Sequence, residues 1–314
     1  MQYSTFAAID IGSYDVILEI FEISKKQGIR SVDKICHRME LGKDTYTLGK
    51  IRPEMEEELC RVLADFVRIM EGYRVDDYRA AASSAISEAS NSLYVLGKIH
   101  QLTGLSVTVL SNSEQRFLSY KALAAMEDNF NKIIEKGTAI LDLDGGSFQI
   151  SLFDKDALVT TQNIRMGSLR IRERLAGIQS ETEHYEEMVE ELIWNEVSSF
   201  KKMYLKDRKI ENIMLIGDVF TDSVYQNIEE KTTKIISREN FNTWYEKIIR
   251  QSPMELAVKL GIPLENASLM YPSAVIYKCL IDMMGAEHIW IPGVHMTRGI
   301  AYEYAEQMKL LKGG

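Results

Sequence analysis

Two segments that lie far apart in the chain share one pattern: an apolar run that ends in aspartate, a short turn rich in glycine and serine, and a second apolar run. The first spans residues 6–21 and turns at the DIGS of residues 10–13. The second spans residues 138–153 and turns at the DLDGGS of residues 142–147. Each predicts a two-stranded hairpin, which differs from the strand–turn–helix of dinucleotide-binding and P-loop folds. The repeat therefore predicts two related domains, each containing one such hairpin.

Helical patterns fill most of the remaining chain. Apolar residues three to four positions apart predict helices over residues 53–72, 113–130, 181–204, 254–260, 272–285 and 297–311. Two more apolar runs, at 106–110 and 212–216, predict further strands. Strands followed by helices in each half are typical of an α/β protein. We therefore expect an α/β fold of two domains, residues 1–122 and 123–314, with a cleft between them and the C-terminal helix at 298–314 packing back on the first domain.

The overall charge and the cysteines restrict the partners and the location of this chain. Its 314 residues include 46 acidic and 37 basic side chains, so the net charge is -9, and a surface of this sign does not attract nucleic acid in general. Three cysteines without CxxC spacing imply neither a disulfide framework nor a zinc site, which fits a reducing cytoplasm. No apolar stretch is long enough to span a membrane, and no signal-peptide pattern precedes the first strand. We expect a cytoplasmic protein with neither a nucleic-acid nor a membrane partner.

The two turns have the residue types of an anion site. Backbone N–H groups that point into a tight turn bind phosphate oxygens, and glycine allows the backbone to approach them closely. An aspartate at the end of the preceding strand can hold hydrated Mg²⁺ against the same oxygens. The alternative is that both are ordinary tight turns in which the aspartate bonds to the local backbone. Because the pattern occurs twice, we favour the phosphate site.

Seven segments, taken in order, resemble motifs of the exopolyphosphatase and guanosine pentaphosphate phosphohydrolase family (Ppx/GppA). They are DIGS at 10–13, ASSAISEASN at 82–91, SNSEQR at 111–116, DLDGGSFQ at 142–149, MGSLR at 166–170, GDV at 217–219 and MTRG at 296–299. Together they cover nearly the whole chain. The resemblance implies two actin-like (ribonuclease H-like) domains with an inter-domain cleft, the fold that actin shares with sugar kinases and Hsp70.

The resemblance also implies roles for individual residues. Asp10 and Asp142 would hold Mg²⁺, with Mn²⁺ as the alternative metal, and Glu114 would be the general base that orients water for attack on a terminal phosphoryl group. The residues that it places against phosphate are Gly12, Ser13, Ser83, Ser84, Gly145, Gly146, Ser147, Arg170 and Gly217. The implied substrate is inorganic polyphosphate or a guanosine polyphosphate, and the implied assembly is a homodimer.

Glu114 also has a purely structural interpretation. It lies in the first turn of the helix predicted at 113–130, where the helix dipole stabilises a negative charge. A carboxylate at a helix start beside a cleft is equally free to take a proton from water. The sequence leaves both interpretations open.

Three turns carry an aspartate that the family pattern lacks: Asp15, Asp144 and Asp218. Each such carboxylate would cost roughly 3–4 kcal/mol if it lay about 4–6 Å from a phosphate at an effective dielectric constant near 20. Extra carboxylates can instead recruit Mg²⁺ or Mn²⁺ that bridges to the phosphate. A third alternative is that these side chains point away from a site that has lost catalysis.

Arginines of the family pattern are also missing. Ile17, Ser87 and Thr297 stand where the family has arginine, although Arg298 follows directly, and Gln149 replaces a glutamate of the second turn. Two functions therefore remain open: a metal-assisted phosphohydrolase, and a phosphate- or nucleotide-binding regulatory module without turnover. An ATP-dependent kinase of the same fold is a third candidate, for which the sequence has no evident adenosine pocket.

Overall fold

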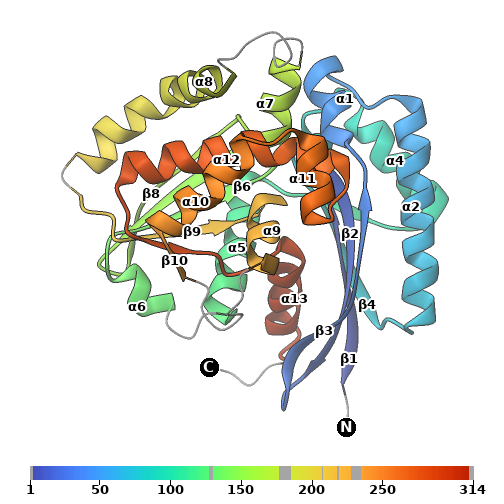
Figure 1. Ribbon diagram of the computed structural model, residues 1–314. Coiled ribbons are helices and arrows are strands. Elements are labelled where there is room, and N and C mark those ends of the chain that lie inside the picture. Colours follow the sequence, from blue (N-terminus) through green and yellow to red (C-terminus); the bar gives the residue numbers. More distant parts are fainter. Residues whose placement is uncertain are drawn as a thin grey trace. The chain divides into compact units, whose positions relative to one another are not determined.

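The computed structural model describes residues 3–126, 130–176, 185–206, 208–217, 219–227 and 235–310 (Figure 1). Contacts between residues divide the chain into two compact units. Unit 1 comprises residues 1–125 and 294–314, and unit 2 comprises residues 126–293. The last helix therefore belongs to the same unit as the first strand.

Unit 1 is built on a mixed sheet with the strand order β3-β2-β1-β4-β5. The strands are β1 (Ser4–Ile11), β2 (Asp15–Ser24), β3 (Gly28–Arg38), β4 (Asp77–Ala82) and β5 (Val107–Val109). β1, β2 and β3 form an antiparallel meander, whereas β1, β4 and β5 are parallel. The register aligns Ile11 with Ala82 and Ala82 with Val109. The segments that follow these three strands therefore leave the sheet at the same edge.

Helices cover both faces of this sheet. α2 (Pro53–Gly72) and α4 (Ser92–Thr103) pack on one face, and α5 (Asn112–Met126) and α13 (Met296–Gln307) pack on the other. Side chains of β1 alternate between the two cores, because successive residues of a strand point to opposite faces: Ala7 joins the first core, and Phe6 joins the second. The ring of Phe6 stacks on Tyr304 of α13 with ring centroids 4.0 Å apart. Two short helices, α1 (Leu41–Leu48) and α3 (Ser84–Ser87), follow β3 and β4.

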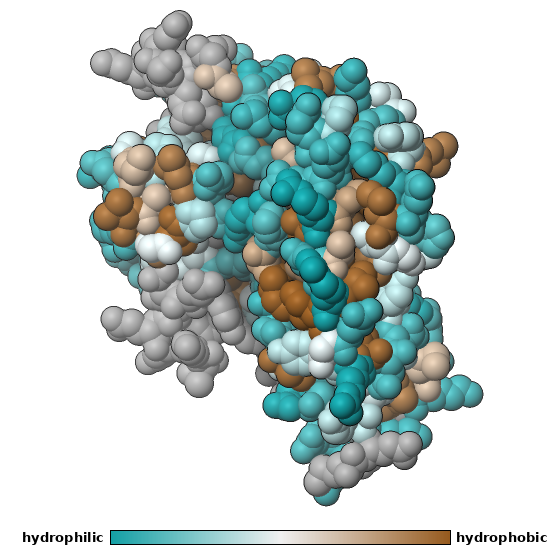
Figure 2. All heavy atoms as spheres, turned by 90° about the vertical axis from the view of Figure 1, so that its right-hand side faces the viewer, coloured by the Kyte–Doolittle hydropathy of each residue, from teal (hydrophilic) through white to brown (hydrophobic). Residues whose placement is uncertain are grey.

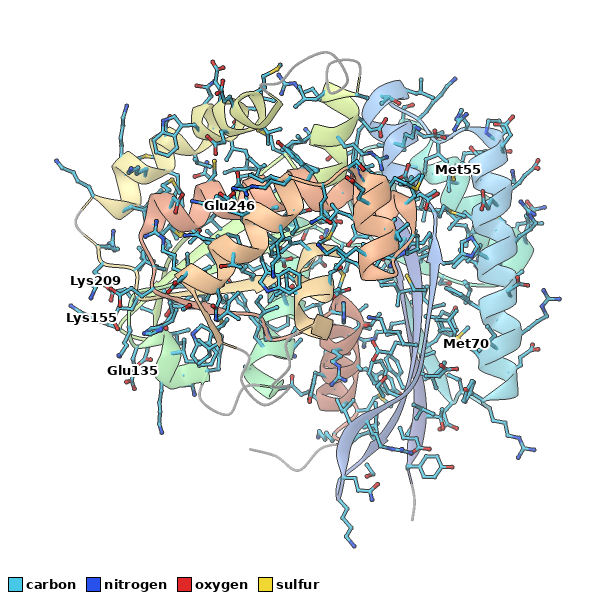
Figure 3. All side chains as sticks on the ribbon, in the orientation of Figure 1. Met55, Met70, Glu135, Lys155, Lys209 and Glu246 are labelled. Carbon is cyan, nitrogen blue, oxygen red and sulfur yellow. The ribbon has the colours of Figure 1, made fainter. Side chains whose placement is uncertain are left out.

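α2 confirms the helix predicted at 53–72. Leu59, Leu63 and Phe66 are buried at the predicted spacing, and proline in the first turn suits a helix start. Figure 3 shows Met55 and Met70, at opposite ends of α2, on the side that faces the strands. Figure 2 views the molecule from the right-hand side of Figure 1, where α2 lies, and shows hydrophobic patches within a mostly hydrophilic surface.

Unit 2 is built on a second mixed sheet, with the strand order β10-β11-β9-β6-β7-β8. The strands are β6 (Thr138–Leu143), β7 (Phe148–Asp154), β8 (Ala157–Ile164), β9 (Asn212–Ile216), β10 (Ile235–Ser237) and β11 (His288–Trp290). β6, β7 and β8 form an antiparallel meander, and β6, β9 and β11 are parallel. The hairpin followed by a parallel neighbour thus occurs in both units, as the sequence repeat predicts.

The helices of unit 2 are α6 (Phe130–Ile134), α7 (Ser168–Leu175), α8 (Tyr185–Phe200), the π-helical turn η1 (Lys201–Leu205), α9 (Val219–Asn227), α10 (Arg238–Ile249), α11 (Pro253–Leu260) and α12 (Leu264–Met284). α12 is the most buried of them: Tyr277 and Ile276 have no exposed surface. Within the described ranges, no helix combines the length and the apolar character needed to cross a membrane.

Three predicted helix boundaries are wrong, one of them the end of the helix predicted at 297–311, since α13 ends at Gln307. α12 does not begin at Pro272 but contains it, since the helix starts at Leu264. Buried Leu269 and Met270 in the preceding turns offset the backbone hydrogen bond that proline removes. The helix predicted at 113–130 ends at Met126, and a separate helix begins at Phe130. For the helix predicted at 181–204, residues 181–184 lie outside the described residues.

Candidate functional site

The β1–β2 turn of unit 1 is held by backbone hydrogen bonds. The N–H of Gly12 donates to the carbonyl of Asp15 over 2.9 Å, and the carbonyl of Ser13 accepts from the N–H of Gly42 over 2.8 Å. A Cβ on Gly12 would lie 2.9 Å from Oδ1 of Asp15. This turn therefore has little room for any residue larger than glycine, as the sequence predicts.

Three hydroxyl groups meet beside this turn. The phenol oxygen of Tyr46, in α1, lies 2.7 Å from Oγ of Ser13 and 2.8 Å from Oγ of Ser84, and the two serine oxygens are 3.4 Å apart. Ser13 has no exposed surface, whereas Tyr46 and Ser84 are partly buried. The structure therefore brings together Ser13 and Ser84, as the resemblance implies. It adds Tyr46, which no motif in the sequence marks.

Ser83 is a structural residue in this arrangement. It is 2% exposed, and its N–H donates to the carbonyl of Ile11 over 3.2 Å. Its hydroxyl lies 3.5 Å from the same carbonyl oxygen. These contacts tie the end of β4 to the end of β1, which fixes where the following Ser84 emerges.

The added carboxylate of Asp15 is neutralised within unit 1. Nη1 of Arg38 lies 2.8 Å from Oδ2 of Asp15, and the two residues are paired in the register of β2 and β3. Sγ of Cys36 lies 3.6 Å from the same oxygen; burial, and next the charge of Asp15, raise the pKa of Cys36 to about 12. An ion pair of this kind offsets part of the repulsion expected between Asp15 and a phosphate. The alternating pattern of residues 28–38 is a signal for a third strand, whereas the pairing of β3 with β2 places Arg38 opposite Asp15.

The β6–β7 turn of unit 2 is held mainly by its own backbone and by α7. The N–H of Asp144 donates to the carbonyl of Ser147 over 2.9 Å, and Oδ1 of Asp144 accepts the N–H of Gly145 over 2.6 Å. Arg170 contacts the same turn: its backbone N–H donates to Gly145 over 2.9 Å, and its Nε donates to the carbonyl of Gly146 over 2.8 Å. The predicted residues Gly145, Gly146, Ser147 and Arg170 thus lie together. The carboxylate of Asp144 and the Nε of Arg170 both form hydrogen bonds with backbone groups of the turn.

Two further glycines approach this turn closely. A Cβ on Gly167 would lie 2.1 Å from the carbonyl oxygen of Asp144. Gly217 has φ +73°, and a Cβ there would lie 2.4 Å from the carbonyl oxygen of Leu143 and 3.0 Å from Oδ1 of Asp142. Gly217 therefore lies beside the predicted turn, and only glycine fits there without a rearrangement. Asp218, which follows it, lies outside the described residues.

Asp10 and Asp142 occupy equivalent positions in the two units. Each lies near the end of the first strand of its hairpin and is partly buried; Asp142 is paired with Gln149 across β6 and β7. Among the described residues, no group of three or more His, Cys, Asp and Glu side chains could form a metal cage. Mg²⁺ does not require one, because it commonly uses one or two carboxylates, with water and substrate phosphates completing its shell. Within its own unit, each of these aspartates has the oxygen donors that such an ion uses.

Glu114 forms a capping box at the start of α5. Its Oε2 accepts from the N–H of Ser111 over 2.8 Å and from Oγ of Ser111 over 2.7 Å, and its own N–H lies 3.3 Å from the same Oγ. The hydrogen bond from the Ser111 hydroxyl, then that from its backbone, lowers the pKa of Glu114. Ser111 follows β5 at the edge where the β1–β2 turn also leaves the sheet. Glu114 is therefore at the predicted edge of unit 1, with a carboxylate that stabilises its own helix.

Comparison with known proteins gives one family. The model of the Ppx/GppA phosphatase family matches residues 19–308, a range that begins after the first turn. The chain is 21% identical over 310 residues to a bifunctional 3-dehydroquinate synthase/phosphatase of Fusobacterium nucleatum. This match covers 90% of this chain and 44% of that protein. It is 25% identical over 144 residues to exopolyphosphatase 1 of Mycobacterium leprae, covering 46% of this chain and 41% of that protein. The chain thus spans less than half the length of these relatives.

Two solved structures have the same fold. A crystal structure of an exopolyphosphatase from Cytophaga hutchinsonii aligns with a TM-score of 0.86 at 16% identity and covers 98% of this chain and 100% of that one. The crystal structure of the Aquifex aeolicus Ppx/GppA family member aligns with a TM-score of 0.77 at 18% identity and covers 98% and 99%. The α/β fold with two actin-like domains is thereby confirmed. From the family match and this fold, the chain belongs to the Ppx/GppA phosphatase family.

Proposed function

We propose that the chain is a metal-dependent phosphohydrolase that removes the terminal phosphoryl group of inorganic polyphosphate or of a guanosine polyphosphate. The observation that carries this proposal is the repeated construction of the two units. In each unit, a turn that contains glycine follows a strand with aspartate next to its last residue. The chain as a whole matches the Ppx/GppA phosphatase family. The curated relatives described as a phosphatase and an exopolyphosphatase support the same reaction class.

Three kinds of group contribute to the proposed reaction. The turn amides and hydroxyls bind and orient the phosphate chain, which contributes to catalysis by positioning. Asp10 and Asp142, each in its own unit, would hold Mg²⁺ or Mn²⁺, and a bound ion would neutralise negative charge on the phosphate oxygens. Glu114 orients a water and takes its proton as the water oxygen bonds to the terminal phosphorus and the bond to the bridging oxygen breaks.

Both hydrogen bonds from Ser111 go to Oε2 of Glu114, whereas a carboxylate has two oxygens that can accept a proton. Its lowered pKa keeps it ionised at neutral pH, which a proton acceptor requires. The same hydrogen bonds reduce its strength as a base. We therefore propose that Oε1 accepts the proton of water while Oε2 keeps its hydrogen bonds from Ser111.

The test is phosphate release from polyphosphate and from guanosine tetraphosphate, each with Mg²⁺, with Mn²⁺ and with a chelator. The proposal expects metal-dependent release from at least one substrate at a rate that increases with protein concentration. No release from either substrate with either metal would reject it.

One group of contacts favours a second candidate, a phosphate-binding module without turnover. Glu114 bonds to Ser111, Asp144 accepts the N–H of Gly145, and Nε of Arg170 donates to Gly146. Groups that would serve catalysis are thus already bonded within the chain. Calorimetric binding of polyphosphate without phosphate release would establish this module and exclude the hydrolase.

A further inference from the structure

The three hydroxyls beside the β1–β2 turn differ in accessibility. Ser13 has no exposed surface, whereas Tyr46 and Ser84 are partly buried. A ligand that reaches this turn without a rearrangement meets Tyr46 and Ser84 first. From this geometry we propose that Tyr46 and Ser84, rather than Ser13, are the side chains that donate hydrogen bonds to a phosphoryl oxygen in unit 1. The inference rests on the proposed phosphate substrate.

The number of protons in the cluster supports this assignment. Three hydroxyls carry three protons, and each oxygen can also accept hydrogen bonds. Ser13 lies 2.7 Å from the phenol oxygen of Tyr46 and can donate to it. When a ligand breaks the 2.8 Å hydrogen bond between Tyr46 and Ser84, both residues can turn their protons toward an anionic oxygen. A donor chain of this kind is polarised cooperatively, so Ser13 strengthens the outer donors although it does not touch the ligand.

Tyr46 is held in position by its own helix. Oγ1 of Thr45 donates to the carbonyl of Ala85 over 2.7 Å, and the N–H of Gly42 donates to the carbonyl of Ser13 over 2.8 Å. α1 is thereby bonded both to the turn and to α3. The phenol consequently reaches the two serines without the flexibility of a surface side chain, which reduces the ordering cost of binding.

The composition of the site identifies the ligand class. Ile17 and Ser87 stand where the family pattern has arginine, so two cations expected beside this turn are absent from these positions. Neutral hydroxyl donors bind an anionic oxygen through charge-assisted hydrogen bonds without adding charge. Such a site suits the oxygen of a phosphate chain whose charge is already reduced by a bound metal ion.

The test compares Tyr46→Phe with Tyr73→Phe. The phenol of Tyr73 donates to Asp33 over 2.7 Å at an exposed site, so this control removes the same atom away from the turn. Calorimetry with a polyphosphate of defined length and Mg²⁺ is the measurement. We expect affinity to fall about tenfold for Tyr46→Phe, because a hydrogen bond to a charged group is lost, and to stay unchanged for Tyr73→Phe.

Ser84→Ala is the second variant, should Tyr46→Phe fail to fold, and the same loss of about tenfold is expected because it removes the other outer donor. Wild-type affinity in a folded Tyr46→Phe or Ser84→Ala protein would overturn the inference while leaving the proposed function in place. Absence of polyphosphate binding and hydrolysis in the wild-type protein would overturn both.

Discussion

The two units hold the same kind of turn in different ways. In unit 1, backbone hydrogen bonds of the turn are supplemented by side chains from α1 and β3: Tyr46 bonds to Ser13, and Arg38 pairs with Asp15. In unit 2, close packing has the larger part, because Gly167 allows α7 to approach the carbonyl of Asp144, and α7 contributes both the backbone N–H and the Nε of Arg170. A glycine-rich turn in the sequence therefore specifies a sharp reversal of the backbone. It does not specify which groups remain available to a ligand.

The units also contain two nearly identical capping boxes. Ser111 donates to Glu114 over 2.8 Å and 2.7 Å, and Ser252 donates to Glu255 over 2.8 Å and 2.8 Å. Both glutamates have lowered pKa values because of hydrogen bonds from their serines. The local chemistry of the two sites is thus the same. Only the position of Glu114 at the edge that holds the β1–β2 turn distinguishes it.

The largest effect is expected from Glu114→Gln, with Glu255→Gln as its matched control. Glutamine can keep a capping box but cannot accept the proton of water. Loss of a general base should lower turnover about a thousandfold. Steady-state phosphate release at saturating substrate measures it, and Glu255→Gln should have the wild-type rate. Equal turnover in both variants would mean that Glu114 serves only as a cap.

Gly167→Ala and Gly12→Ala test how the two turns are packed. The Cβ added at position 167 would meet a backbone oxygen at 2.1 Å, whereas the one at position 12 would meet a side-chain oxygen of Asp15 at 2.9 Å. A side chain can rotate away and a backbone cannot. We expect the free energy of unfolding to fall by about 3 kcal/mol for Gly167→Ala and by about 1 kcal/mol for Gly12→Ala. Urea denaturation measures both, and the reverse order would contradict the comparison.

Arg38→Met tests whether Asp15 is neutralised by its neighbour. Without Arg38, the 13% exposed carboxylate of Asp15 would repel the phosphate chain. We expect polyphosphate affinity to fall about fivefold, a modest loss because the Arg38 side chain is 35% exposed and solvent screens the pair. The double variant Arg38→Met/Asp15→Asn should recover the affinity. A double variant as weak as Arg38→Met would show that Arg38 acts in another way.

The smallest effect concerns acid stability. A carboxylate whose pKa is lower in the folded state than its ordinary value of 4.5 contributes stability above that value, and the contribution is lost as the pH falls through the folded-state pKa. Glu114→Gln and Glu255→Gln should each flatten the decline of the urea midpoint between about pH 5 and about pH 3, and by similar amounts. A much larger change for one of them would mean that the two capping boxes differ energetically in solution.

The sequence predicted the features that depend on neighbouring residues. Continuous apolar runs predicted β6 and β9, and apolar residues three to four positions apart predicted the whole of α2. The pattern failed at Pro272, where burial of residues in adjoining turns outweighs the helix-breaking tendency of proline. The metal at Asp10 and Asp142 and the base role of Glu114 stay predictions.

The sequence by itself determined the two hairpins and their glycines, because a tight reversal between strands needs particular residues within a few positions of one another. Tertiary structure alone decided which side chains face each turn. Tyr46 reaches Ser84 only because α1 packs against α3, and Arg38 reaches Asp15 only because β3 pairs with β2 in one register. Contacts between residues that are distant in the chain depend on packing and strand register, which no local pattern specifies.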